Sequence, residues 1–158
     1  MKKVISLLLA LVLCLSLCAC YSGKKLTTTD VEEALVNCDG TLNMETSGDK
    51  VTSFTYVVEN VNADDLMDKE YTRKAIYAML SGDTSKITIG QLQVCKAISP
   101  LVNIEALFES EDDFDAEAFV GKMLSIVCDA KTVEYDGWAV FTKVDQDNDR
   151  IVINVVSE

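Results

Sequence analysis

Alternating carboxylates occupy residues 145–149, which read Asp-Gln-Asp-Asn-Asp. Oxygen ligands at alternate positions can converge on Ca²⁺. An EF-hand loop would also need glycine at its sixth position and glutamate at its twelfth, where this chain has Arg150 and Val156. The EF-hand is therefore excluded, and a polar hairpin loop is the favoured interpretation of the segment. The candidate ligands of an irregular cation site are Asp145, Asp147 and Asp149.

A second acidic run, residues 109–117, holds six carboxylates. A pair of carboxyl groups can serve as general acid and base on a glycosidic bond. That chemistry needs one of the pair to be buried, whereas this run has the composition of a solvated segment. Acids in the first turn of a helix are stabilised by the helix dipole, and Asp115 is well placed to cap such a helix. The helix-terminal interpretation is favoured, and no catalytic residue is assigned.

Histidine is absent from the whole chain. Catalysis by Ser-His-Asp or Cys-His groups is therefore excluded, as is every His-ligated zinc, copper or haem site. The cysteines form no C-x-x-C pair, and the chain contains no Gly-rich phosphate loop or nucleophile elbow. We therefore expect no cofactor.

Three cysteines follow residue 20, and an odd number of thiols cannot all pair within one molecule. Cys95 and Cys128 fall on apolar faces of predicted helices, and Cys38 lies near a helix end. Free, mostly buried thiols are the favoured interpretation. A Cys95–Cys128 disulfide between helices remains the alternative.

Aromatic side chains gather on the predicted strands. Exposed rings on a sheet can bind a peptide or a sugar, although aromatic residues more often belong to the core. Trp138 follows the turn residues Asp136 and Gly137 and is expected to be partly exposed, so it is the candidate ligand-binding residue. The set comprises Phe54, Tyr56, Tyr135, Trp138 and Phe141.

The first twenty residues combine a basic start, an apolar run and a final cysteine. Lys2 and Lys3 precede an apolar segment of fourteen residues, 4–17. Such a segment is shorter than the ~20 residues of a membrane-spanning helix and has the length of a signal-peptide core. Residues 17–20 then read Leu-Cys-Ala-Cys.

This ending resembles the lipobox of bacterial lipoproteins, in which an aliphatic residue, a small residue and a cysteine stand at −3, −1 and +1. Leu17, Ala19 and Cys20 match, whereas Cys18 at −2 departs from the usual pattern. The resemblance implies a signal peptide of residues 1–19 and a diacylglycerol thioether on Cys20. An ordinary secretory signal cut after Ala19, or an uncleaved anchor, is the alternative, and Leu17 fits such a cleavage site poorly.

The expected mature chain, residues 20–158, is strongly acidic. Two of the 14 basic residues lie in the signal peptide, so 12 remain against 26 acidic ones, a formal charge of −14. This charge disfavours nucleic acids and anionic membrane surfaces as partners. We therefore expect the lipid on Cys20, and not the protein surface, to hold the chain at the membrane.

The remaining residues predict one α+β domain, residues 29–158, after a short tether, residues 20–28. A helix capped by Thr29 or Asp30 comes first, and hairpins at both ends of the domain are expected to share one antiparallel sheet. Three or four helices lie between the hairpins and pack on the sheet, and Pro100 either begins a new helix or kinks a longer one. The predicted strands cover residues 41–46, 51–58, 132–135, 138–144 and 151–156, and the later helices cover 63–80, 88–98, 100–108 and 116–127.

These features predict a surface-exposed lipoprotein that is lipid-anchored at the extracytoplasmic face of the cell membrane and acts as a non-enzymatic binding module. One alternative is a carboxylate-based envelope glycan hydrolase. Another is an accessory or inhibitory subunit of an envelope complex. The expected partners are the membrane, through Cys20, and an envelope protein or glycan.

Overall fold

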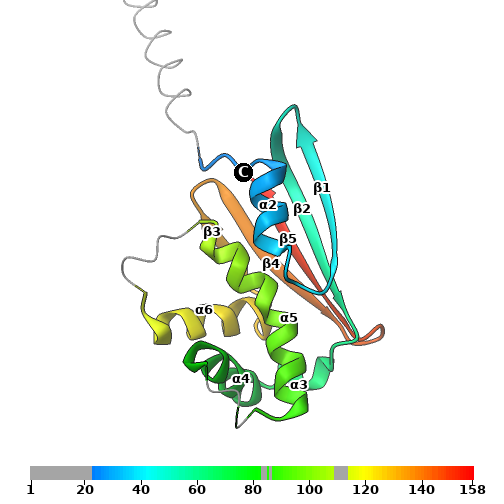
Figure 1. Ribbon diagram of the computed structural model, residues 1–158, viewed down its shortest axis with the longest axis vertical. Coiled ribbons are helices and arrows are strands. Elements are labelled where there is room, and N and C mark those ends of the chain that lie inside the picture. Colours follow the sequence, from blue (N-terminus) through cyan, green and yellow to red (C-terminus); the bar gives the residue numbers. More distant parts are fainter. Residues whose placement is uncertain (1–22, 83–84, 86, 109–113) are drawn as a thin grey trace, which may run out of the picture.

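The computed structural model describes residues 23–82, 85, 87–108 and 114–158 of the chain (Figure 1). These residues form an α+β domain in which one five-stranded antiparallel sheet, of order β1-β2-β5-β4-β3, carries helices on one face. The helices are α2 (Thr28–Leu35), α3 (Ala63–Met67), α4 (Lys69–Ser81), α5 (Ile89–Ala106) and α6 (Ala116–Val127). The strands are β1 (Thr41–Ser47), β2 (Lys50–Glu59), β3 (Val133–Tyr135), β4 (Trp138–Asp145) and β5 (Arg150–Ser157).

The two hairpins of the chain are joined through β2 and β5. Seven residue pairs connect these strands, from Ser53 opposite Val156 to Glu59 opposite Arg150. The prediction of one sheet built from hairpins at both ends of the domain is therefore confirmed. The pairing also places the β1–β2 and β3–β4 turns at one end of the sheet and the β4–β5 loop at the other (Figure 1).

The core lies between the sheet and the helices. Alternate residues of each strand point into it, as β5 shows. In β5 the buried side chains are Ile151, Ile153 and Val155, whereas Val152 and Asn154 between them point to the open face of the sheet. Burying one such aliphatic side chain stabilises a fold by about 1.5–3 kcal/mol. The open face is mixed in character, because Asn154 there accepts a hydrogen bond from the Thr55 hydroxyl at 3.2 Å.

The first helix begins earlier than predicted. Thr27, and not Thr29 or Asp30, is the N-cap, and its hydroxyl and the Asp30 carboxylate satisfy each other's backbone N–H groups in a capping box. Leu26 and Val31 flank this box and are both buried, which is the arrangement of a hydrophobic staple. The bond from the Thr27 backbone N–H is the largest cause of the lowered pKa of Asp30.

The single helix predicted over residues 63–80 is wrong, because the chain breaks at Asp68. Asp68 has an extended backbone that ends α3, and its carboxylate accepts from the backbone N–H groups of Glu70 and Tyr71 at 2.9 and 3.0 Å. A short acidic side chain that satisfies these donors favours a new helix start over continuation of the old helix. The Thr72 hydroxyl then donates to the carbonyl oxygen of Leu66 and ties the two helices together.

Pro100 lies inside one continuous helix, α5, so the longer of the two arrangements is the one that forms. Thr88 caps this helix in a second capping box, with Gln91 as the reciprocal partner. Proline removes one backbone donor from a helix interior, and Pro100 is accommodated in α5 as a buried residue.

Replacing Ala130 by glycine is expected to raise the free energy of unfolding by about 0.5–1 kcal/mol. Ala130 follows α6 with a positive φ of 49°, and Lys131 donates its backbone N–H to the Ser125 carbonyl oxygen across it. Alanine is strained in this left-handed conformation and glycine is not. Urea unfolding followed by circular dichroism measures the change. Ala118→Gly, at an exposed position inside α6, is the matched control and is expected to destabilise by about 1 kcal/mol.

Candidate functional site

The chain enters the domain through a docked leader, residues 23–26. The Lys24 backbone N–H donates to the Asp136 carbonyl oxygen at 3.1 Å, and the Leu26 carbonyl oxygen accepts from the Val51 N–H at 3.0 Å. The Leu26 side chain is buried in the core. Residues 20–28 were predicted to be a short tether, and within that segment residues 23–26 are held on the sheet by backbone bonds and a buried apolar side chain.

Trp138 helps to hold this leader on the domain through a hydrogen bond. Its indole N–H donates to the Lys24 carbonyl oxygen at 2.6 Å, and its side chain is only 3% exposed. The ring also lies against Phe108, with centroids 6.0 Å apart. The prediction that Trp138 is partly exposed is therefore wrong, because the leader covers the ring that the turn was expected to expose. A ligand-binding role for Trp138 stays a prediction.

The leader crosses the β3–β4 turn so closely that only glycine fits. A β-carbon built on Gly23 would collide with the Asp136 carbonyl oxygen and press on the Gly137 backbone. Gly137 has φ 79°, a conformation that L side chains rarely adopt. Two glycines therefore permit the contact that the Trp138 hydrogen bond secures.

Gly23→Val is expected to undock the leader and shift the emission of Trp138 to longer wavelength. The valine side chain cannot share the space of the Asp136 carbonyl oxygen, so water reaches the indole ring. Trp138 is the single tryptophan of the chain and reports this change without interference. Gly48→Val is the control, since Gly48 has φ 64° but open space around it, and it is expected to strain the β1–β2 turn without moving the emission. An unchanged spectrum for Gly23→Val would contradict the docking.

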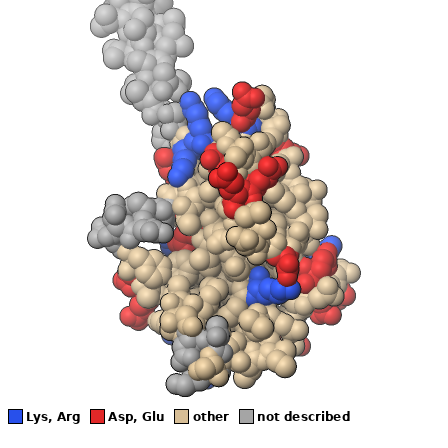
Figure 2. All heavy atoms as spheres, in the orientation of Figure 1, with Lys and Arg blue, Asp and Glu red and all other residues tan. Residues whose placement is uncertain are grey.

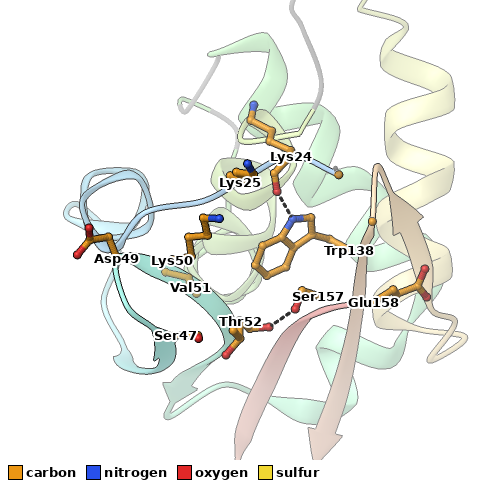
Figure 3. A pocket seen from close by; sticks show the side chains of 12 residues that line it. Lys24, Lys25, Ser47, Asp49, Lys50, Val51, Thr52, Trp138, Ser157 and Glu158 are labelled. Carbon is orange, nitrogen blue, oxygen red and sulfur yellow. Dashed lines mark hydrogen bonds between the residues drawn. The ribbon is translucent and has the colours of Figure 1, made fainter. Parts of the chain in front are cut away.

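A hollow of about 410 Å³ opens beside the leader (Figure 3). It lies between the leader, the β1–β2 turn, the β3–β4 turn and the end of β5. In Figure 3 three lysines, Lys24, Lys25 and Lys50, gather around Trp138, and Asp49 and Glu158 stand at its margins. Ser157 and Thr52 also line this hollow, where the Ser157 hydroxyl donates to the Thr52 carbonyl oxygen at 2.8 Å.

A second hollow, of about 470 Å³, lies between the end of α2, the end of α4 and the first half of α5. We call it the α5 groove. Two exposed apolar side chains line it, Ile89 at 82% and Leu92 at 57% exposure. An ion pair between Lys96 and Asp39 lies at its rim. An exposed apolar surface rimmed by charges is typical of a protein contact site.

The three described cysteines are free thiols, and the alternative Cys95–Cys128 disulfide does not form. The Cys95 thiol donates to the Ala75 carbonyl oxygen, the Cys128 thiol donates to the Leu66 carbonyl oxygen, and Asn103 donates to the Cys38 sulfur. Burial is the largest cause of the raised pKa of each of these thiols. None of them is therefore an activated nucleophile.

Alkylation by iodoacetamide at mildly alkaline pH is expected to be at least roughly tenfold slower in the folded protein than in urea, because a buried thiol with a raised pKa presents little thiolate. Intact mass spectrometry counts the adducts. Urea should expose all three thiols, Cys38, Cys95 and Cys128, without prior reduction. Rapid modification of any of them in the folded state would contradict this account.

The Asp145–Asp149 loop does not present its carboxylates to a shared cation. The Asp145 carboxylate accepts from Asn148 and from the Arg150 guanidinium, each at 2.9 Å, and these two hydrogen bonds lower its pKa. Asp149 has φ 48°, and its carbonyl oxygen accepts from the Val61 N–H. Within the ranges that the structure describes, no group of three or more acidic or cysteine side chains is placed to hold a metal ion, so Asp145, Asp147 and Asp149 are not brought together as ligands.

The second acidic run is described only in part. Its residues 109–113 lie outside the described residues. Asp115 caps α6 as predicted, with its carboxylate accepting from the Glu117 and Ala118 N–H groups. The rings of Phe114 and Phe119 pack 5.4 Å apart across this start. Asp115 therefore has a structural role in the described part of the run.

Sequence reasoning missed a partly buried ion pair between α6 and the C-terminal end of α5. The Lys122 ammonium on α6 lies 2.5 Å from the Glu105 carboxylate on α5 and 5.3 Å from the centroid of the Tyr135 ring. The Glu105 side chain is almost fully buried. A charge on an otherwise apolar helix face could have signalled the pair, since such a charge needs a buried counter-ion.

The remaining aromatic candidates belong to the core. Phe54, Tyr56 and Tyr135 are buried, whereas Phe141 lies half-buried on the open face of the sheet. The Tyr56 hydroxyl donates to the Cys38 carbonyl oxygen at 2.9 Å, so its polar end is satisfied inside the fold. No aromatic member of the set lines the α5 groove.

No protein-family model, curated protein or solved structure matches this chain. Among the described helices, none is long and apolar enough to cross a membrane.

Proposed function

We propose that the chain is a lipoprotein held at the extracytoplasmic face of the cell membrane by a diacylglycerol on Cys20, and that its domain is a non-enzymatic binding module. The observation that carries the proposal is the sequence Leu17-Cys18-Ala19-Cys20 immediately before the docked leader. Lys2, Lys3 and the apolar residues 4–17 before it complete the pattern of a lipoprotein signal peptide.

The test is a Cys20→Ala variant of the full chain, expressed in a bacterial host with lipoprotein processing. The wild-type protein is expected in the membrane fraction with the mass of residues 20–158 plus lipid. The variant should lose the lipid mass and keep its signal peptide or leave the membrane. Cys18→Ala is the matched control, because it removes a neighbouring thiol and retains the lipobox pattern. A Cys20→Ala protein that stayed membrane-bound at unchanged processing would refute the anchor.

An accessory subunit of an envelope complex is the second candidate, and the α5 groove is the observation that favours it. Ile89 and Leu92 are exposed on a helix whose other face is buried in the core. Leu92→Lys would place a charge in this groove, and Val156→Lys on the open sheet face is the control. If the detergent-extracted protein migrates as part of a larger assembly, Leu92→Lys alone should release it. A wild-type protein that migrates alone would count against this candidate.

A further inference from the structure

The antiparallel topology collects four segments at the end of the sheet where the leader enters. They are the leader itself, the β1–β2 turn, the β3–β4 turn and the end of β5. We call this surface the anchor end. The β4–β5 loop and the helix α3 lie at the opposite end (Figure 1).

Chain length fixes the anchor end close to Cys20. Tyr21 and Ser22 alone separate Cys20 from Gly23, whose backbone is packed on the β3–β4 turn. Three residue steps span roughly 11 Å at most. A diacylglycerol on Cys20 would put that residue at the level of the lipid headgroups, so the anchor end could not leave the headgroup layer while the leader stays docked.

The anchor end differs in charge from the rest of the domain. Three lysines and two carboxylates line its hollow, a formal charge of +1, whereas the other side chains of residues 20–158 sum to −15. Figure 2 shows lysine or arginine side chains at the top of the domain, with acidic side chains beside them. The net charge of the domain is therefore negative, whereas the charge of the hollow at the anchor end is positive.

Among the described residues, the three lysines of the anchor end also lack carboxylate partners. In the part of the chain that the structure describes, no carboxylate lies within 4.0 Å of the ammonium groups of Lys24, Lys25 or Lys50. Five other cations are paired, including Lys69 with Asp129 and Lys74 with Glu70. Three more described cations are likewise unpaired and line no part of this hollow, namely Arg73, Lys131 and Lys143.

We infer that the anchor end rests on the membrane surface, with Lys24, Lys25 and Lys50 on the phosphate groups of anionic phospholipids. This inference rests on the proposed lipid anchor. The ammonium groups supply charge complementarity to phosphate, and the short link supplies a high local concentration. The anchor thus holds the domain in one orientation, with the α3 and α4 end turned away from the bilayer.

The test uses the lipidated full-length protein in vesicles that carry a nitroxide on the lipid headgroup, and it follows the quenching of Trp138. Quenching is expected to be stronger in vesicles containing phosphatidylglycerol than in pure phosphatidylcholine, and to weaken with added salt. The double variant Lys25→Gln/Lys50→Gln should weaken docking by roughly fivefold per lysine in the anionic vesicles. Lys131→Gln/Lys143→Gln is the matched control, since it removes the same charge from two unpaired lysines elsewhere.

The possible outcomes distinguish a failure of the docking inference from a failure of the proposed lipid anchor. If the protein carries the lipid and quenching is the same in both vesicle types and in both variants, the docking inference fails and the anchor stands. If the control variant loses as much quenching as Lys25→Gln/Lys50→Gln, general charge is responsible and the inference also fails. If the membrane-extracted protein carries no diacylglycerol mass, the proposed anchor fails and the docking inference falls with it.

Discussion

Trp138→Ala is expected to lower the free energy of unfolding by about 4 kcal/mol. The substitution removes a nearly fully buried ring that contacts Phe108, and it leaves a cavity beneath the leader. It also removes the indole N–H that binds the Lys24 carbonyl oxygen. Urea unfolding monitored by circular dichroism measures the change, because the variant has no tryptophan fluorescence.

Phe141→Ala is the matched control for Trp138→Ala. Both residues are large aromatics of β4, but Phe141 is half-buried on the open face of the sheet. Its removal is expected to cost about 1 kcal/mol, a value usual for a residue outside the core. Equal losses for the two variants would contradict the assignment of Trp138 to the core. Trp138→Phe should lie between them, since it keeps a ring and loses the hydrogen bond to Lys24.

Lys122→Met is expected to destabilise the domain by about 3 kcal/mol, because removal of one partner leaves a charge buried without it. Lys122 supplies the ammonium at 2.5 Å from the Glu105 carboxylate, and methionine retains the apolar stem beside Tyr135. Urea unfolding followed by Trp138 fluorescence measures the loss. The effect is larger than that of a surface ion pair, which contributes about 0–1 kcal/mol.

Two further variants test this explanation. Lys143→Met removes the same charge from an exposed lysine of β4 and is expected to change stability by less than about 0.5 kcal/mol. Glu105→Gln combined with Lys122→Met should be less destabilised than Lys122→Met alone, because the double variant no longer buries a carboxylate charge without the Lys122 ammonium. A double variant that is worse than the single one would show that the charge of Glu105 is needed for a reason other than Lys122.

Local patterns were sufficient where neighbouring residues determine the structure. Asp115 was predicted to cap α6 and does so, because the donors that it satisfies lie two and three residues away. The hairpins followed from strand alternation, and their merger into one sheet followed from the simplest way to bury both apolar faces. The split at Asp68 was missed, because an acidic residue inside a helical pattern fits either a helix surface or an N-cap.

The leader could not be predicted as a docked segment, because two of its partners, Asp136 and Trp138, are more than a hundred residues away. The bond from Trp138 to Lys24 spans 114 positions. Nothing near Trp138 in the sequence shows that residues 23–26 will cover it. The sequence did contain one local signal, since Leu26, Thr27, Asp30 and Val31 have the spacing of a hydrophobic staple and capping box.

The local charge of the anchor end also depends on contacts between segments that are distant in the sequence. A formal charge of −14 for residues 20–158 predicts repulsion from an anionic surface, and that prediction treats the charge as uniform. Folding brings Lys50 beside Lys24 and Lys25 by docking the leader next to the β1–β2 turn. The sequence separates these lysines by more than twenty residues, so their proximity depends on tertiary structure alone.

The docked leader also has a mechanical consequence. A pull on residue 20 would load its contacts one at a time, in peeling geometry: first the Lys24–Asp136 backbone bond, then the Trp138–Lys24 bond, and then the Leu26–Val51 bond. Release of residues 23–26 would add about 14 Å of slack at 3.3–3.6 Å per residue. The load would reach α2 and the core only after that extension. The leader is therefore an extensible link that would yield before the domain unfolds.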